Sequence, residues 1–370
     1  MENSREYIYK ADDARHHFSN DHAKTVIIPA DITSLGHNFY AWSQVENFKV
    51  ANENPHFADD DGVLFDKTRT VLHKYPEGRR SHSYTVPDGV LKIKSNAFSD
   101  SSDIFTRFSS DAHEGQEGFT ITLPASVTSI EDMAFNSGSR RLGAIHVHED
   151  NPGFSSREGV LFDKNTKTLI CCPAGFAKND YVIPDTVKII HREGFSGCVH
   201  LTRVALPAGL THIGEHAFEE CRNLLEINIP GTVVVISAFS FSYCFKLTNV
   251  YLQEGTQCID TATFGMCNFM KNILIPRSVT NIESTALSLS PSLTIHCHEN
   301  SFAHEFALER RLSFAFVEDQ IPHFPIDGDT IPGALRIDGK ALEEQLMGNR
   351  EIAGLLENIA GMAGPIIIKN

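Results

Sequence analysis

The chain has 370 residues and a formal net charge of −15 at pH 7, with 47 acidic and 32 basic side chains. This balance argues against nucleic acid as a partner, because attraction to phosphate needs clustered Lys and Arg. No run of about 18 apolar residues is present, so we expect no membrane span.

The N-terminal residues 1–23 show no clear periodicity, and we interpret them as a cap or arm. Their beginning is polar and lacks the apolar core of a secretory signal. The chain is therefore expected to be cytoplasmic, or secreted or at the cell surface if a signal has been removed.

Four copies of one 23-residue pattern fill residues 184–275. The copies begin at Pro184, Pro207, Pro230 and Gln253, and equal offsets carry Ile190, Ile213, Ile236 and Ile259, then Phe195, Phe218, Phe241 and Phe264, then Cys198, Cys221, Cys244 and Cys267. A fixed period of this length predicts a solenoid, in which each unit covers the apolar face of its neighbour. We place this solenoid over residues 24–316.

Within one repeat, the segment Arg203–Leu206 alternates outward and inward positions, which is typical of a strand with one buried face. The proline that follows has no amide hydrogen and turns the chain. The Val-x-x-Ile segment predicts a second short strand on the opposite wall, and Ala-Phe-x-x-Cys predicts a short helical turn. The expected fold is thus a mainly β stack of parallel strands, with its cysteines reduced in the core.

A longer period of 97 residues is also visible, because the sequence motif at residues Asn54 to Phe65 is repeated at Asn151 to Phe162. In both copies two apolar runs flank a polar turn, which indicates a β-hairpin. We expect hairpins at about residues 57–76 and 154–173, inserted into longer coils and standing out from the stack.

The end of the repeat array is predicted to be a cap over residues 296–316, with an amphipathic helix that begins near Ser301 and a last strand. Residues 317–370 do not repeat. An apolar face formed by Leu342, Leu346, Ile352, Leu355, Leu356 and Ile359 predicts a helix over about residues 340–362. Whether this tail docks on the solenoid or offers its helix to a partner is open at this stage.

The outward strand positions are the candidate binding residues. They form two rows: Arg203, Glu226, Asn249 and Asn272, and beside them Ala205, Asn228, Tyr251 and Leu274. A polar row next to an aromatic and an aliphatic side chain is a plausible protein-recognition patch, since aromatic residues commonly anchor interfaces. The alternative is a solvated sheet face.

Metal and catalytic motifs are incomplete. His146-x-His148 and His296-Cys297-His298 place ligand types on alternate residues, but no four-ligand spacing is complete. No P-loop, G-x-S-x-G or His-Glu-x-x-His motif is present. We therefore expect no metal, no cofactor and no catalytic residues.

The repeat unit Pro, Val-x-x-Ile, Ala-Phe-x-x-Cys, x-x-Leu, x-x-Ile-x-Leu-Pro resembles the BspA-like leucine-rich repeat family between Thr25 and Phe316. The phrases that begin at Asp61 and Ser301 resemble that family too, whereas Glu158, Gln253 and the tail depart from it. The resemblance implies a right-handed leucine-rich-repeat-type stack. It also implies bacterial surface proteins that bind host proteins or other cells.

We therefore expect a non-enzymatic, monomeric interaction scaffold that binds an unidentified protein through its sheet face and hairpins. One alternative is a bacterial cell-surface or host-directed adhesin for a matrix protein or glycan. Another is a small activity or a partner-docking function in the C-terminal tail.

Overall fold

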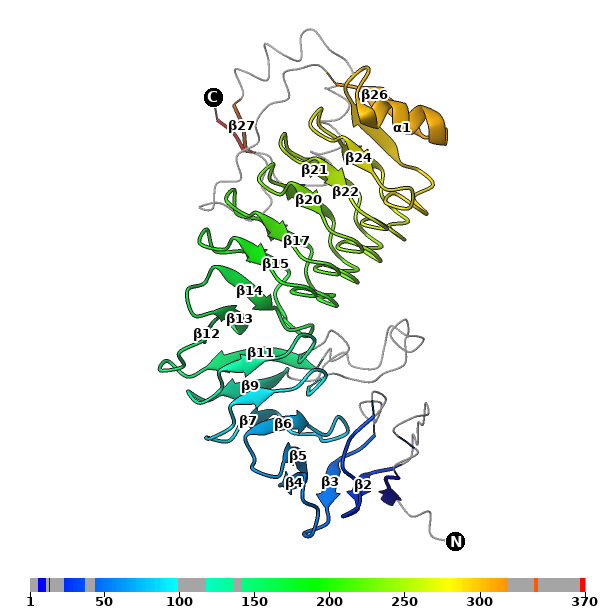
Figure 1. Cartoon of the computed structure of the whole chain (residues 1–370). Coiled ribbons are helices and arrows are strands. Elements are labelled where there is room, and N and C mark those ends of the chain that lie inside the picture. Colours follow the sequence, from blue (N-terminus) through cyan, green and yellow to red (C-terminus); the bar gives the residue numbers. More distant parts are fainter. Residues whose placement is uncertain are drawn as a thin grey trace. The chain divides into compact units, whose positions relative to one another are not determined.

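The computed structural model describes residues 6–10, 13, 23–36, 44–98, 118–135, 141–317, 336–338 and 367–369. It confirms a mainly β solenoid of about 12 turns with parallel strands (Figure 1). The contacts divide the chain into two units. Unit 1 is Met1–Ala177, Ile190–Val199 and His216–Glu219, and unit 2 is Lys178–Ile189, His200–Glu215 and Glu220–Asn370.

Unit 1 contains four groups of strands. They are β1 (Glu6–Ile8), β2 (Thr25–Ile28) and β3 (Asn47–Val50); β4 (Phe57–Asp60), β5 (Val63–Asp66), β6 (Val71–Lys74), β8 (Lys92–Ile93) and β10 (Ser129–Ile130); β7 (Ser83–Thr85), β9 (Phe119–Leu123) and β11 (Leu142–Val147); and β12 (Phe154–Arg157), β13 (Val160–Asp163) and β14 (Thr168–Cys171). Strand β16 (Ile189–Ile190) falls where the two units divide. Strand β1 pairs in parallel with β2, so the N-terminal segment supplies a rung of the sheet.

Each hairpin insertion contains three antiparallel strands instead of two. The added strand, β4 or β12, comes from a tight turn at Asp61-Gly62 or Glu158-Gly159, where both residues have positive φ. Such a turn matches the twist of a two-residue hairpin. The middle strand does not stand out from the stack as expected, because Val63, Leu64 and Phe65 are buried. The insertions therefore belong to the wall of the solenoid.

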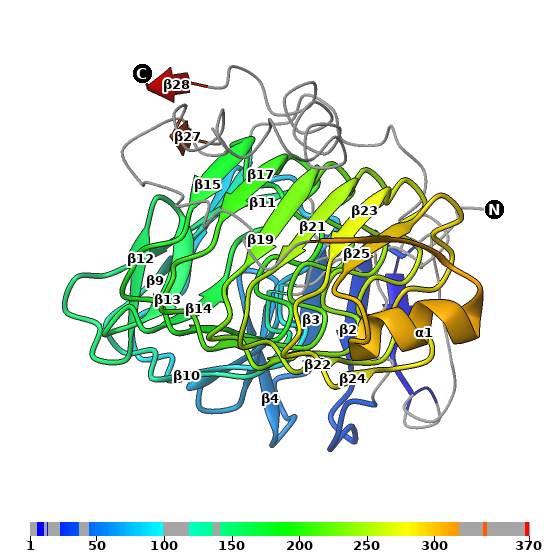
Figure 2. The ribbon, with the colours of Figure 1, turned by 90° about the horizontal axis from the view of Figure 1, so that it is seen from above.

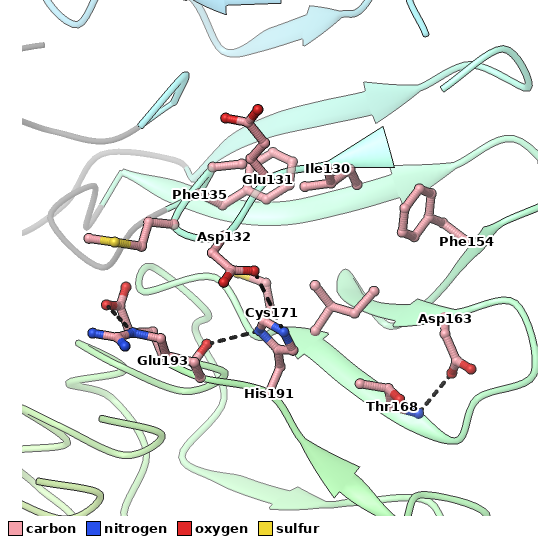
Figure 3. Close-up of a pocket in the computed structure, with 14 residues that line it drawn as sticks. Ile130, Glu131, Asp132, Phe135, Phe154, Asp163, Thr168, Cys171, His191 and Glu193 are labelled. Atoms are coloured by element: carbon pink, nitrogen blue, oxygen red, sulfur yellow. Dashed lines mark hydrogen bonds and ion pairs between the residues drawn. The ribbon is translucent and has the colours of Figure 1, made fainter. Parts of the chain in front are cut away.

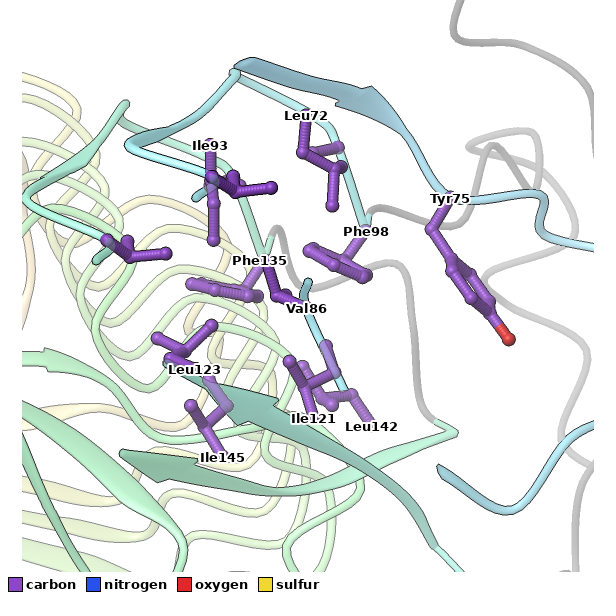
Figure 4. Close-up of a cluster of buried hydrophobic side chains, with 14 of the residues drawn as sticks. Leu72, Tyr75, Val86, Ile93, Phe98, Ile121, Leu123, Phe135, Leu142 and Ile145 are labelled. Atoms are coloured by element: carbon purple, nitrogen blue, oxygen red, sulfur yellow. The ribbon is translucent and has the colours of Figure 1, made fainter. Parts of the chain in front are cut away.

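Unit 1 has two apolar clusters, one around β2 and β3 and a larger one between Val63 and Leu161 (Figure 4). The rings of Phe98 and Phe135 stack with their centroids 5.5 Å apart, and Ile121, Leu123 and Ile145 from β9 and β11 close the cluster. These inward residues alternate with outward ones along each strand, as the period of two requires. Apolar residue types that recur at equivalent positions of successive coils are thus explained by core packing.

Unit 2 contains most of the regular repeats (Figure 2), whereas Ile190–Val199 and His216–Glu219 belong to unit 1. Its strands are β15 (Asp180–Val182) and β17 (Arg203–Ala205); β19 (Glu226–Ile229), β21 (Asn249–Leu252), β23 (Asn272–Leu274), β25 (Thr294–Cys297) and β26 (Ser313–Phe316); and, on the other wall, β18 (His212–Ile213), β20 (Val235–Ile236), β22 (Cys258–Ile259) and β24 (Asn281–Ile282). All pairings between these strands are parallel. Phe241 and Phe264 stack between the walls at 5.4 Å.

The coil corners are turns bounded by two left-handed residues. One row of these residues is Glu193, His216, Phe239 and Ala262, and the other is Gly197, Glu220, Tyr243, Met266 and Leu289. A left-handed conformation costs a residue with a Cβ atom roughly 1–2 kcal/mol. The corner is nevertheless kept, because it lets the Phe between the two left-handed residues and the Cys that follows them reach the interior. All eight cysteines are free thiols.

Helix α1 (Phe302–Arg310) lies near the end of the solenoid and is followed by its last parallel strand, β26. The Ser301 hydroxyl accepts a hydrogen bond from the backbone N–H of His304, and Arg311 closes the helix in a left-handed conformation. Phe306 is buried, but Phe302 is 38% exposed, so only one of the two expected aromatic residues packs inward. In the tail, β27 (Arg336–Asp338) pairs in parallel with β28 (Ile367–Lys369). The helix predicted over residues 340–362 and most of the loop 99–118 lie outside the described residues.

Candidate functional site

The seven residues predicted to bind lie on four consecutive outward strands of unit 2. They are Arg203 on β17, Glu226 and Asn228 on β19, Asn249 and Tyr251 on β21, and Asn272 and Leu274 on β23. The pairing aligns Glu226, Asn249 and Asn272 in one row. It aligns Asn228, Tyr251 and Leu274 in the next row. The structure therefore brings the predicted residues together.

Both rows are longer than the prediction. In the five-stranded sheet, β25 and β26 extend the rows that begin at Glu226 and Asn228, and in the two-stranded sheet β15 pairs with β17. We call the outward residues of these two sheets together the outward face: Asp180, Val182, Arg203, Ala205, Glu226, Asn228, Asn249, Tyr251, Asn272, Leu274, Thr294, His296, Ser313 and Ala315. His296 was missed because the last repeat is one residue shorter, which hides its alignment with Leu274. Counting back from Arg203 by 23 residues would have found Asp180.

Side-chain hydrogen bonds run across the outward face from strand to strand. Asn272 Nδ2 donates to Asn249 Oδ1 over 2.9 Å, and His296 Nε2 lies 2.9 Å from Asn272 Oδ1. An amide oxygen can only accept, so His296 must carry its proton on Nε2 in this bond. A chain of three side chains is thus locked into one orientation.

Three further polar groups near the centre of the face are hydrogen-bonded or partly shielded from water. Gln253 Nε2 donates to Asn228 Oδ1 over 3.2 Å. Burial raises the pKa of Glu226, an effect that the nearby Arg203 partly offsets. Burial also raises the pKa of the Tyr251 phenol, with a further contribution from Glu226. Both raised pKa values mean that the ionised forms of Glu226 and Tyr251 are disfavoured at the centre of the face.

A groove of about 220 Å³ lies in unit 1 (Figure 3). Its floor is apolar, with Ile130, Phe135 and Phe154, and His191 faces Asp132 across its rim with 3.7 Å between Nε2 and Oδ1. This volume lies below the roughly 300–1,000 Å³ of typical small-molecule pockets. The groove is therefore a weaker candidate than the outward face.

Cys171 also lines the groove, next to His191, and the pair invites comparison with a nucleophilic dyad (Figure 3). Burial raises the pKa of the Cys171 thiol, and Cys198 and Glu193 add to the effect. The reactive form of cysteine is the thiolate, which a raised pKa removes at neutral pH. The arrangement does not supply a nucleophile.

The histidine pairs named from the sequence do not assemble into a metal site. Among the described residues, no group of three His, Cys, Asp or Glu side chains is placed to hold a metal ion. His148 instead lies 3.8 Å from Asp150, and His296 bonds to Asn272. Within the same residues no helix has the length and apolar character needed to cross a bilayer.

Comparison with known proteins places these features in context. The sequence matches the BspA type leucine-rich repeat region in six copies, over residues 77–149 and 176–294, which is more than half of the chain. No curated protein sequence matches the chain.

Two solved structures share the fold. A leucine-rich repeat protein from Eubacterium ventriosum is 20% identical with a TM-score of 0.53, and the match covers 74% of this chain and 66% of that one. A leucine-rich cell surface protein from Faecalibacterium prausnitzii is 20% identical with a TM-score of 0.55, and covers 82% and 85%. Identities this low show the fold alone.

Proposed function

Because the chain belongs to the BspA-type leucine-rich repeat family, we propose that it is a non-enzymatic scaffold that binds another protein on its outward face. The supporting observation is the fixed chain of Asn249, Asn272 and His296 beside Tyr251 and Leu274. Side chains that are already held in one rotamer lose little entropy on binding. An aromatic and an aliphatic residue next to them supply the apolar anchor that interfaces need.

The hairpins contribute less to this proposal than the outward face. Their middle strands are buried, and the acidic groups near the first turn already have partners. Asp61 lies 3.1 Å from Arg79, and Asp59 Oδ1 accepts a hydrogen bond of 2.7 Å from the backbone N–H of Val50. Binding through these groups would first have to break existing contacts.

The test is affinity capture with the full chain, using partners identified by mass spectrometry. The double change Tyr251→Ala and Leu274→Ala should abolish capture of the specific partner. Val234→Ala with Val235→Ala is the matched control, because these residues are exposed aliphatic side chains on the opposite wall of the same unit. Equal capture by both double variants would show that the outward face is not the binding surface.

A cell-surface adhesin is the second candidate function. It is favoured by the description of the similar Faecalibacterium prausnitzii protein as a cell surface protein. Brief protease treatment of intact cells tests it, because a surface protein is cleaved while internal proteins stay intact. If this protein survives such treatment unchanged, the adhesin function is excluded.

A further inference from the structure

The hydrogen-bonded wall that contains β10 and β14 is interrupted inside unit 1. Strand β14 pairs with β13 of the second hairpin insertion on one edge, and on its other edge the Leu169 carbonyl accepts from the N–H of His191. In a regular coil the first of these edges belongs to the wall strand of the preceding coil, as β20 pairs with β18. The insertion therefore takes the place of β10, which is left as the edge strand of the sheet β10-β8-β6-β5-β4.

Ile130 on β10 presents backbone groups at this open edge. The N–H of the next residue, Glu131, donates to the carbonyl of Ile93 on β8 over 3.0 Å. Successive residues of a strand direct their backbone groups to opposite sides, so the N–H and the carbonyl of Ile130 face away from β8. Ile93 and Ile130 occupy the same repeat position, but among the described residues no backbone N–H reaches the carbonyl of Ile130.

The corner that follows β10 shows the same interruption. In the preceding coil, the N–H of Phe98 donates to the carbonyl of Ala134 over 2.9 Å. Phe135 holds the place of Phe98 one coil later, yet its N–H has no backbone acceptor within the part of the chain that the structure describes. Ile130 and Phe135 thus end one stretch of the hydrogen-bond ladder.

The groove of about 220 Å³ lies at this interruption, and all the residues that line it belong to unit 1 (Figure 3). Apolar residues line it from the coil of β10, from the edge strand β12 and from β14: Ile130, Phe135, Phe154 and Ile170. An open strand edge beside an apolar pocket suits an extended peptide, because the peptide backbone pairs with the edge while alternate side chains enter the pocket. The volume is too small for a drug-sized ligand and fits one large side chain.

The rim of the groove is acidic. The lining residues comprise one arginine, one histidine and four acidic residues: Glu131, Asp132, Asp163 and Glu193. The Glu131 carboxylate lies 2.7 Å from the ammonium groups of both Lys92 and Lys94, so its charge is balanced. Asp132, whose side chain is 71% exposed, and Asp163 have no Lys or Arg at ion-pair distance among the described residues. Basic side chains of a bound peptide would complement these two carboxylates.

We propose that the groove is a second binding site, for an extended segment of a partner protein that adds to β10. One apolar side chain of the segment enters the groove beside Phe135 and Phe154, and the basic residues next to it lie near Asp132 and Asp163. The backbone of the segment supplies an acceptor for the N–H of Ile130 and a donor for its carbonyl. The site goes beyond the proposed function, because it shares no residue with the outward face.

Hydrogen exchange resolved to single residues tests the open edge. In the free protein the amide of Ile130 should exchange much faster than that of Glu131, which is already hydrogen-bonded to Ile93. A bound peptide should slow the exchange of Ile130 and leave that of Glu131 unchanged. An Ile130 amide that is as slow as Glu131 in the free protein would overturn the proposal, because the chain itself would then pair with this edge.

The binding probe is a capped seven-residue peptide with leucine at alternate positions and lysine or threonine between them, titrated against the full chain by fluorescence anisotropy. Two further versions carry N-methyl groups on one or the other set of alternate amides, which blocks pairing on one side of the peptide only. Pairing with a single edge predicts that one version binds about tenfold more weakly and that the other binds like the unmodified peptide. Equal affinity of all three peptides would overturn strand addition.

Charge variants locate the peptide on the protein. Asp132→Lys should weaken binding several-fold, whereas Asp150→Lys, at a side chain of unit 1 that is 81% exposed and lies outside the groove, should leave it nearly unchanged. An equal loss in both variants would show general attraction to an acidic protein and would contradict the site. The double variant Tyr251→Ala and Leu274→Ala should bind the peptide like wild type, so failure here is separate from failure of the capture experiment.

Discussion

At the scale of single residues, the first hairpin holds a buried ion pair. Lys74 Nζ lies 2.5 Å from Glu77 Oε1 and 3.1 Å from the carbonyl of Asn96, and the Lys74 side chain is fully buried. The corresponding positions of the second hairpin, 97 residues later, carry Cys171 and Ala174. The fold thus accepts an ion pair or two small uncharged residues at this place.

Removing only one charge of this pair should be costly. We expect Lys74→Met to lower the free energy of unfolding by about 3–5 kcal/mol, because Glu77 loses its ion-pair contact with Lys74 in a buried setting. The double change Lys74→Cys and Glu77→Ala, which reproduces the second hairpin, should cost less than Lys74→Met alone. Urea unfolding measures both, and a double variant that is less stable than Lys74→Met would contradict this view.

Histidine 73 makes the same hairpin sensitive to acid. Burial, helped by the nearby Lys94, lowers the pKa of His73 to about 4, compared with about 6.5 in an unfolded chain. Between these values the unfolded state binds a proton that the folded state does not. Stability is therefore unaffected above pH 6.5 and falls as the pH drops from 6.5 to 4.

The expected loss is on the order of 2 kcal/mol after allowance for partial exposure. His73→Phe should remove this part of the pH dependence in chemical unfolding. His216→Gln is a control of opposite sign: a hydrogen bond to Glu219 raises the pKa of His216, so its contribution is present at low pH and is lost as the pH rises. A His73→Phe profile parallel to that of wild type would disprove the assignment.

At the scale of elements, the sequence motif Asn-Pro-x-Phe explains how each hairpin insertion is held against the coil that precedes it. Asn151 Nδ2 donates to the carbonyls of Pro124 and Val127, and its Oδ1 accepts from the N–H groups of Gly153 and Phe154. Asn54 makes the equivalent four bonds in the first copy. One fully buried amide thus bridges two stretches of backbone in each case.

Asn151→Asp tests this bridge with hardly any change of shape. The carboxylate keeps the two acceptor bonds but loses both donors and faces two carbonyl oxygens instead. We expect a loss of about 2–4 kcal/mol in the free energy of unfolding. Asn165→Asp, at an exposed turn of the same insertion, is the control and should change stability by less than about 0.5 kcal/mol. Equal effects in thermal unfolding would refute the bridge.

The elements also show what a sequence can and cannot predict. The 23-residue period placed the strands and the inward Phe and Cys ladders, because periodicity reports directly on which side chains are buried. The tight turns at Asp61-Gly62 and Glu158-Gly159 were missed, although a two-residue turn ending in Gly is a known hairpin signal. Six of the seven outward residues, all except Arg203, are aligned by the strand pairing as predicted, but the burial of Asn249 was not foreseen, because the period of two predicts only that its side chain points away from the core.

At the scale of the whole molecule, each coil contacts mainly its neighbours, so stability should be distributed along the chain. Phe241→Ala removes a fully buried ring that stacks on Phe264, and should cost about 3–5 kcal/mol. Hydrogen exchange should show the loss of protection in the adjacent strands β19, β21 and β23, and less loss with each further coil of unit 2. Phe269→Ala, at an exposed ring, should change little, and a uniform loss across unit 2 after Phe241→Ala would contradict the nearest-neighbour view.

The proline that opens three of the four regular copies has a consequence for how such a chain can change over generations. It marks a joint at which one 23-residue segment of coding sequence can be duplicated or deleted without altering the geometry on either side. Duplication of residues 230–252 would widen the sheet by one strand, about 4.8 Å, and add one more position to each outward row. The size of the outward face can therefore be adjusted by recombination between copies, independently of the side chains that the face carries.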